Sequence, residues 1–241
     1  MTVVNTLFPF VSSITTFVFA FFVFKRYRER NTGHLLLWGI GLIFYAIGGF
    51  CEAYFGAFGW NDLIYRMWYL FGAILVAAWM GQGTVYLLAK QRTAHVLMGL
   101  LLIGSLYGIF KVFSAELDPS LLTTSTHTGS ELSGHAIVTS GVRSLTPIFN
   151  LYGVITLVGG AVYSAWIFFR KRVLLHRTIG NILIAIGAIL PGFGGAFSRF
   201  GIPGALYIGE LLGAILLFAG FVRATTPMKV REGQMVEPAA S

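Results

Sequence analysis

The feature that most constrains this chain is a series of seven apolar segments, each long enough to cross a lipid bilayer as a helix. To within a few residues they cover 3–24, 34–55, 62–88, 94–113, 147–169, 179–198 and 204–222. A helix of about 20 apolar residues spans the ~30 Å hydrocarbon core of a membrane. The segment 62–88 is long enough to tilt or to project beyond the bilayer. The pattern predicts an all-α fold, a polytopic membrane protein built as a seven-transmembrane-helix bundle.

The composition supports insertion into lipid. The 241 residues are 56% hydrophobic and 11% charged, whereas about 25% of the residues in soluble domains are charged. We therefore expect the lipid bilayer to be the main partner of residues 1–224, which form one transmembrane domain. Residues 225–241 include two prolines and few apolar side chains, so they predict a disordered cytoplasmic tail.

The basic residues predict the orientation of the chain. Thirteen of the seventeen Lys and Arg residues fall in four clusters on alternate connections and the tail: Lys25–Arg30, Lys90–Arg92, Arg170–Arg177 and Arg223–Arg231. Basic connections stay in the cytoplasm, which places the N-terminus outside and the C-terminus inside a cytoplasmic-type membrane, either inner or plasma. Because the bases follow the membrane topology and form no common patch, we expect no nucleic-acid partner.

The connection 114–146 is much longer than the others and lies on the predicted outer side. It contains a polar run over 123–130. Loops of this length are usually either functional or disordered. Two interpretations stay open at this point: a mobile, solvated loop, or a lid over an outward-facing pocket.

A weak internal sequence repeat favours a 3+1+3 arrangement, in which helices one to three repeat as helices five to seven. The stretch Tyr69–Leu75 resembles Glu210–Leu216, and Gly33–Phe50 resembles Gly180–Phe197. Both triplets of helices would run in the same sense, so the repeat would be parallel, with the fourth helix as a linker. This plan resembles the topology of SWEET-type sugar transporters, although their Pro-Gln pair is missing.

Four charges lie in the outer half of the predicted membrane region: Glu52, Arg66, Arg199 and Glu210. Charge within a bilayer costs free energy and often marks a functional site. Pairing across the short outer connections joins Glu52 with Arg66 and Glu210 with Arg199, and the swapped pairs fit the sequence equally well. The alternative is that the groups near the helix ends only reach the interface.

Uncharged residues extend this candidate site. Tyr69 and Tyr207 lie beside the charges, where they form either an interfacial belt or a pocket wall. Pro191 lies inside a glycine-rich helix and predicts a kink or hinge. Glycine elsewhere in the helices is expected to let backbones approach closely. Gln82 is expected to make a hydrogen bond between helices.

Several cofactor classes are disfavoured. The five histidines lie at helix ends or in the long loop, so we expect no bis-His haem. The seven-helix plan resembles microbial rhodopsins in topology, but the segment 204–222 has no lysine to hold covalent retinal. A polyene held without a covalent bond stays possible. With one cysteine, Cys51, and no HExxH or GxSxG motif, we identify neither a metal site nor catalytic residues.

The leading functional hypothesis is a protein that binds or transports a small molecule through an outward-facing intramembrane pocket and is not an enzyme. The site would comprise the four charges with Tyr69 and Tyr207. A second hypothesis is a structural or sensory subunit that docks another membrane protein or a second copy of itself. A membrane-embedded lipid-modifying enzyme is third.

Overall fold

Seven long apolar helices make up most of the described structure, as the sequence predicts. The computed structural model describes residues 3–123, 132–171, 175–202 and 204–225, and within them it contains helices and no strand. Seven of these helices are long and apolar enough to cross a membrane. The all-α class is therefore confirmed, and so is the expectation of seven helices long and apolar enough to span a membrane. The predicted tail, apart from Thr225, and the polar run beyond Thr123 lie outside the described residues.

Five spans are single helices and two contain a π-helical segment. The single helices are α1 (Val3–Arg30), α2 (Gly33–Phe58), α5 (Gln91–Ser114), α10 (Leu175–Arg199) and α11 (Ala205–Thr225). The third span consists of α3 (Asp62–Met67), η1 (Trp68–Leu75) and α4 (Val76–Leu88). The fifth consists of α8 (Leu145–Gly153), η2 (Val154–Val158) and α9 (Gly159–Arg170). A short helix, α6 (Pro119–Thr123), lies in the long connection.

Some helices run beyond their apolar segments. For example, α1 continues through the basic cluster to Arg30, and α2 continues to Phe58. Lys and Arg are good helix formers, and their long side chains can extend toward water from a helix that begins in lipid. Hydropathy therefore marks the apolar core of each helix better than it marks the ends.

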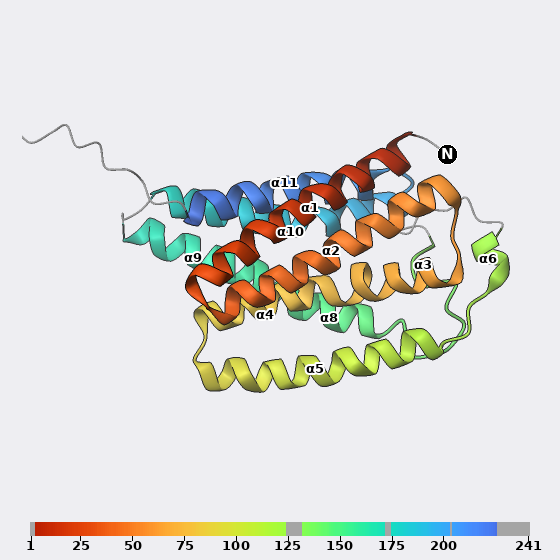
Figure 1. The fold of residues 1–241 in the computed structure, drawn as a ribbon, viewed down its shortest axis with the longest axis horizontal. Helices are drawn as coiled ribbons and strands as arrows, with labels where there is room; N and C mark the ends of the chain where they lie inside the picture. Colours follow the sequence, from red (N-terminus) through yellow and green to blue (C-terminus); the bar gives the residue numbers. More distant parts are fainter. Residues whose placement is uncertain (1–2, 124–131, 172–174, 203, 226–241) are drawn as a thin grey trace, which may run out of the picture.

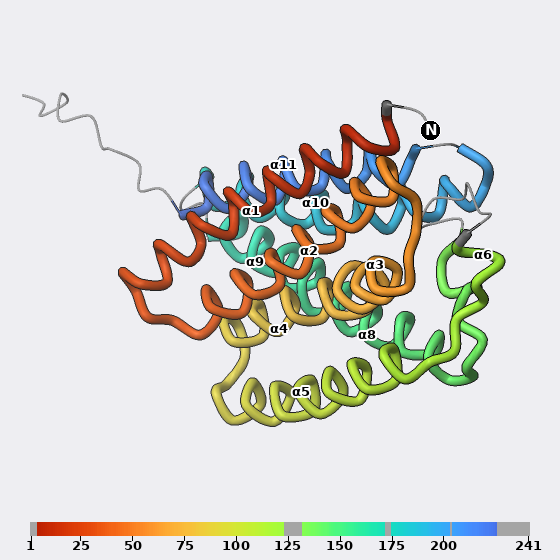
Figure 2. The backbone as a smooth tube through the Cα atoms, turned by 45° about the vertical axis from the view of Figure 1, so that its right-hand side comes forward, coloured from red at the N-terminus to blue at the C-terminus, as the bar shows by residue number. Residues whose placement is uncertain are grey.

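Six spans close into a ring. Helix α1 packs on α2, and α2 packs on η1 and α4 of the third span. The third span packs through α4 on α8 and η2 of the fifth span, and the fifth span packs through η2 and α9 on α10. Helix α10 packs on α11, and α11 packs on α1 to close the ring. The fourth span, α5, packs outside the ring against α4 and η1. Figures 1 and 2 both show α5 set apart along one side of the bundle. Most of its apolar surface consequently faces outward.

A small apolar cavity lies where the six ring spans converge. Every ring span contributes to its wall, which is made by Phe19, Trp38, Leu42, Met80, Leu157, Ile184, Leu217 and Phe221. None of these side chains is charged. The cavity therefore marks the axis of the ring.

Glycine allows the closest helix packing, between α10 and α11. Gly187 and Gly194 of α10 lie seven residues apart, and a Cβ built on Gly187 would lie 2.8 Å from the backbone nitrogen of Leu217. A Cβ on Gly213 of α11 would lie 2.8 Å from the carbonyl oxygen of Gly187. That carbonyl is the one that Pro191 leaves without its helical N–H donor. Helix α10 continues through Pro191, and the predicted hinge there stays a prediction.

The glycine contacts do not repeat between the two halves of the chain. Gly72 of η1 touches Gly48 of α2. In the proposed repeat, the equivalent residues are Gly213 and Gly195, but Gly213 faces Gly187 instead. The parallel repeat stays a prediction.

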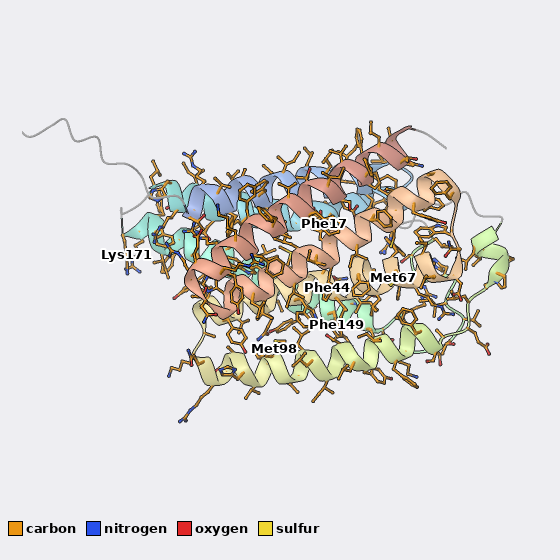
Figure 3. The ribbon with its side chains drawn as sticks, viewed as in Figure 1. Phe17, Phe44, Met67, Met98, Phe149 and Lys171 are labelled. Carbon is orange, nitrogen blue, oxygen red and sulfur yellow. The ribbon has the colours of Figure 1, made fainter. Side chains whose placement is uncertain are left out.

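The two ends of the bundle differ in charge. We call the end that carries the α1–α2, α4–α5 and α9–α10 connections the basic end, where the cluster Lys25–Arg30 and Lys171 lie. In Figure 3, Lys171 marks this end, on the left. The opposite end carries the long connection after α5, and we call it the loop end. The described residues of all four basic clusters thus lie at the basic end.

The packing of α10 on α11 leads to a stability prediction. The substitution Gly187→Ala should destabilise the protein by about 1–3 kcal/mol, because the new methyl group meets backbone atoms that cannot move independently. This corresponds to a fall of roughly 2–10 °C in the apparent melting temperature in detergent. Gly192→Ala on the same helix is the matched control, since a Cβ there meets nothing within 4 Å. Equal melting temperatures for the two variants would contradict this account of the packing.

Candidate functional site

The structure brings two acidic side chains together inside the membrane region. Glu52 of α2 and Glu210 of α11 lie close enough for their carboxyl groups to interact electrostatically. Helices α2 and α11 are not neighbours in the ring, since α1 lies between them. The two acids therefore meet across the interior of the ring. We call them the acid pair.

The acid pair is shielded from water. Glu52 is 1% exposed, and although Glu210 is partly exposed as a residue, its Oε2 atom is buried. The indole Nε1 of Trp68 donates to Glu52 Oε1 at 2.9 Å, and the hydroxyl of Tyr45 donates to the backbone oxygen of Glu210 at 2.8 Å. Oε2 of each acid is buried and has no hydrogen-bond partner among the described residues.

A hydrogen bond between two carboxyl groups needs a proton. Ionised carboxylates can only accept hydrogen bonds, so one member of the pair must carry the hydrogen. Two ionised carboxylates in contact also repel each other strongly away from water. A hydrogen bond between the carboxyl groups of Glu52 and Glu210 would therefore require one proton held between the two helices. Such a proton would belong to the pair and not to either residue.

Local sequence explains why the acids meet at the same depth. Glu52 lies six residues before the end of α2, and Glu210 lies five residues after the start of α11. Both are therefore about 8–9 Å below the loop end of their helices. Gly48, one turn from Glu52, brings the backbone of α2 against η1, which begins at Trp68. Segments of π-helix widen the turn and often occur at functional sites.

Aromatic rings cover the loop-end side of Glu52. Phe55 and Trp60 stack with ring centroids 4.5 Å apart, and Trp60 lies 5.5 Å from Trp68. Tyr65 lies 5.8 Å from Trp68 and 6.2 Å from Tyr69. All five rings are buried. We call these five residues the aromatic cluster.

The long connection packs over the loop end as a cap. We use this name for its described residues, 115–123 and 132–144. An isolated bridge joins Leu117 with Ile137, and Val138 N donates to Glu116 O at 3.0 Å. Apolar cap residues belong to the same buried core as the aromatic cluster, namely Ala115, Leu122, Leu132, Ala136, Ile137 and Val142. In these residues the connection is a packed cover, not a solvated loop.

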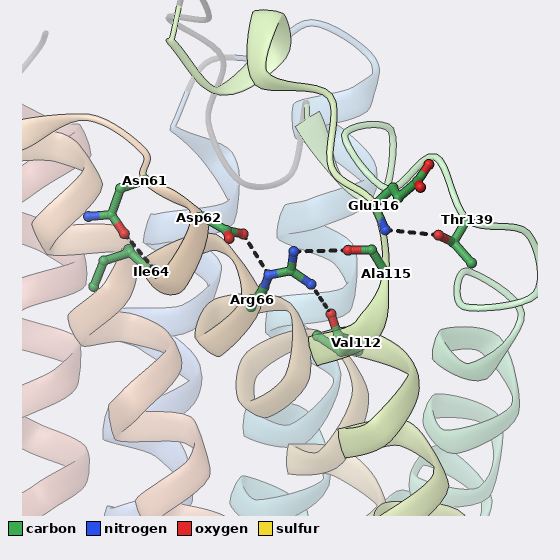
Figure 4. Close-up of polar contacts among 8 residues, drawn as sticks. All are labelled: Asn61, Asp62, Ile64, Arg66, Val112, Ala115, Glu116 and Thr139. Carbon is green, nitrogen blue, oxygen red and sulfur yellow. Dashed lines mark hydrogen bonds and ion pairs between the residues drawn. The ribbon is translucent and has the colours of Figure 1, made fainter.

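The structure corrects the expected partner of Arg66. Its Nε donates to Asp62 Oδ1 at 2.6 Å, and its Nη2 donates to the backbone oxygen of Ala115 at 2.9 Å (Figure 4). Its Nη1 donates to the backbone oxygen of Val112. The Arg66 side chain is 12% exposed. Arg66 therefore joins the third span to the end of α5 and the cap, because Asp62 lies one helical turn away and supplies the charge that Glu52 was expected to supply.

The other predicted residues surround the acid pair at different distances. Arg199 Nη2 donates to the hydroxyl of Ser133 in the cap at 3.3 Å, so the described contacts of Arg199 are with the cap and not with Glu210. The hydroxyl of Tyr69 accepts from Thr146 at 2.9 Å. Tyr207 is fully buried on α11, one turn before Glu210. Pro191 lies on α10 against Gly213.

Two features of the site were not predicted from the sequence. Tyr45 lies seven residues before Glu52 on α2, so both side chains lie on one face of the helix. That spacing is a signal that sequence reasoning could have used. The acid–acid pairing itself has no such signal, because opposite charges were available at similar depths and only the tertiary structure decides among them.

No protein-family model, curated protein or solved structure matches this chain. The functional argument therefore depends on the acid pair, its surroundings and the seven apolar helices.

A proton shared by the acid pair could be detected directly. Infrared difference spectra of the purified protein should contain a carboxylic acid C=O band that shifts in heavy water and disappears in both Glu52→Gln and Glu210→Gln. Either substitution leaves one carboxylate with an amide N–H donor, so no proton is needed for the hydrogen bond. Glu116→Gln is the control, since Glu116 lies in the cap and outside the pair. A band of full intensity in either pair variant would show that the proton lies elsewhere.

Proposed function

We propose that this protein is a non-enzymatic membrane protein that binds a small molecule and moves it along the axis of the helix ring in exchange for the proton of the acid pair. The observation that carries the proposal is the close approach of the Glu52 and Glu210 carboxyl groups in the ring interior, each with a buried Oε2 atom that has no hydrogen-bond partner among the described residues. Ionisable groups inside a membrane commonly belong to proton relays and substrate pathways. This pair spans the interior, where a solute would pass.

The free-energy cost of charge in a membrane explains how binding and proton release would be coupled. An isolated charge near the bilayer centre costs about 2.5–3.5 kcal/mol on insertion scales. If the pair lost its proton with nothing in its place, two buried negative charges would face each other. The proton should therefore leave only when another positively charged or hydrogen-donating group arrives. This linkage is what converts a proton gradient into directed movement of a solute.

The remaining parts of the ring supply a route. The cap covers the loop-end side of the acid pair, and the apolar cavity lies on its basic-end side. Passage to either side of the membrane needs a change in one of these two barriers. An apolar constriction resists water and ions while it stays closed.

We further propose that the loop end faces outward and the basic end faces the cytoplasm of a cytoplasmic-type membrane. The gathering of the basic clusters at one end supports this orientation. A reporter protein that is active only in the cytosol should work when fused after Ser241. Activity of a periplasmic or extracellular reporter at that position would reverse the orientation.

A transport assay tests the proposed function. Purified protein in liposomes with an imposed pH gradient should dissipate the gradient when one class of solute is added from a panel of organic cations, organic anions, neutral sugars and monovalent metal ions. Glu52→Gln and Glu210→Gln should reduce this proton flux to the level of empty liposomes, because each removes the exchangeable proton.

The matched control is Glu116→Gln, which removes an acid from the cap and should leave the flux unchanged. A docking subunit, in which the acid pair acts only as a clasp between helices, would give no flux with any solute class. Equal flux in wild type and Glu210→Gln would also reject the proposal.

A further inference from the structure

We infer that the end of α9 binds an anionic phospholipid, with the headgroup phosphate on Arg170 and the rest of the lipid packed along Tyr163 and Trp166. The site lies at the basic end, on the outward surface of the fifth span, and shares no residue with the acid pair. Failure of this inference would therefore leave the proposed function unaffected.

The outward surface of the fifth span is largely apolar. Ile155, Val162 and Phe169 are all exposed, Phe169 to 71%, although side chains of these types are usually buried in soluble proteins. Tyr163 and Trp166 lie on the same surface and are 52% and 53% exposed. In a bilayer, lipid acyl chains cover a surface of this kind, so the molecules next to it are lipids.

Three hydrogen-bond donors lie in a stripe along this surface. Arg170 comes four residues after Trp166 and seven after Tyr163, so the three side chains share one face of α9. The rings of Tyr163 and Trp166 stack with centroids 6.3 Å apart. The guanidinium carbon of Arg170 lies 5.4 Å from the centroid of the Trp166 ring. This contact holds the guanidinium along the helix, beside the lipid-facing surface.

Positive charge is concentrated at the end of α9 without a compensating acid. Lys171 is exposed, as Figure 3 shows, and the guanidinium carbon of Arg177 lies 5.7 Å from the ring centroid of Phe168. The sequence has neither Asp nor Glu between positions 132 and 209. Among the residues that the structure describes, Arg170 and Arg177 form no ion pair. An anion would therefore be attracted here, and a guanidinium matches the geometry of a phosphate well.

The depth of the two rings favours a phospholipid over a free anion or an acidic protein. The helix rise places Trp166 about 6 Å and Tyr163 about 10 Å below Arg170 along the span. Neither the indole N–H of Trp166 nor the hydroxyl of Tyr163 has a hydrogen-bond partner in the described part of the chain. A phospholipid carries a phosphate at its surface, with ester oxygens and acyl chains beneath it, so one molecule matches all three side chains. Aromatic side chains at this level and basic clusters at span ends both interact with lipid headgroups.

The natural tryptophans provide a local measure of lipid contact. Trp60, Trp68 and Trp79 are buried and Trp38 is half-buried, whereas Trp166 is more than half exposed. Bromine atoms on an acyl chain quench tryptophan fluorescence on contact. Quenching by a brominated lipid therefore reports mainly on the lipid that lies against Trp166.

The experiment compares brominated phosphatidylglycerol with brominated phosphatidylcholine, at equal mole fractions, in liposomes that contain the full-length protein. The anionic lipid should be preferred by about fivefold in the wild type, which is roughly the contribution of one basic side chain at a membrane surface. Arg170→Gln should remove most of this preference. Arg170→Lys keeps the charge but loses the planar guanidinium, so it should retain part of the preference.

The matched control is Arg92→Gln, which removes the same charge from an exposed position on α5 at the same end. It should leave the lipid preference unchanged, because Arg92 lies on another span, away from the stripe. Native mass spectrometry of the detergent-purified protein provides a second measurement: the wild type should retain about one more phosphatidylglycerol than Arg170→Gln. Melting temperatures identify any variant that fails to fold.

Three outcomes would overturn the inference. Equal quenching of the wild type by the two lipids would show that the end of α9 does not select an anionic headgroup. Equal losses in Arg170→Gln and Arg92→Gln would show diffuse attraction to the whole basic end and no site on α9. If inorganic phosphate removes the preference at millimolar concentrations, the ligand is a free anion and not a lipid.

Discussion

The structure depends on one constraint: inside lipid, every polar group must find its partner within the protein. The interior shows how this is met. Gln82 of α4 donates to the backbone oxygen of Ala94 on α5 at 2.8 Å and accepts from the hydroxyl of Tyr152 on α8, which confirms the expected hydrogen bond between helices. Trp79 donates to Ser105 of α5 at 3.1 Å. Each of these bonds joins two spans, so satisfying polar groups and assembling the bundle are the same process.

The same constraint gives the loop end its arrangement. Arg66 lies one turn inside the third span, where water cannot solvate all of its N–H groups. It donates to one carboxylate and to two backbone oxygens at the end of α5. Carbonyl groups at the C-terminal end of a helix have no N–H donor within that helix. The guanidinium thereby fixes the start of the cap. In the structure, the charge of Arg66 joins the third span to α5 and the cap.

Much of the fold could be predicted from the sequence, because hydropathy reports directly on the solvent around a helix. The seven spans and the role of glycine at the α10–α11 contact follow from local composition and residue size. The partners of the charges could not be predicted in the same way. Four charges at similar depths permit several pairings, and the choice depends on which helices face each other around the ring. The placement of α5 outside the ring is not encoded in any single segment.

The packing of the cap could not be predicted from the sequence either. Its sequence has the polar character of a solvated loop, yet Leu132, Ala136 and Ile137 are buried against the aromatic cluster. Single apolar residues scattered among polar ones in a connection do not form the regular spacing that identifies a helix or a strand. Burial there depends on the surface that the ends of the third and fifth spans offer. Sequence reasoning from period and length therefore treats such a segment as a loop, although it closes one end of the bundle.

Under the proposed function, the position of the acid pair would give its proton a mechanical role as well as a chemical one. Glu52 belongs to the half of the ring formed by α1, α2 and the third span, and Glu210 belongs to the half formed by the fifth span, α10 and α11. A shared proton holds the two carboxyl groups in contact, whereas two ionised carboxylates repel. Occupancy of the pair therefore acts on the separation of the two halves. Because α10 and α11 pack through glycine with almost no intervening side chains, they would move as one body, and the pair is where that body is attached to α2 across the interior.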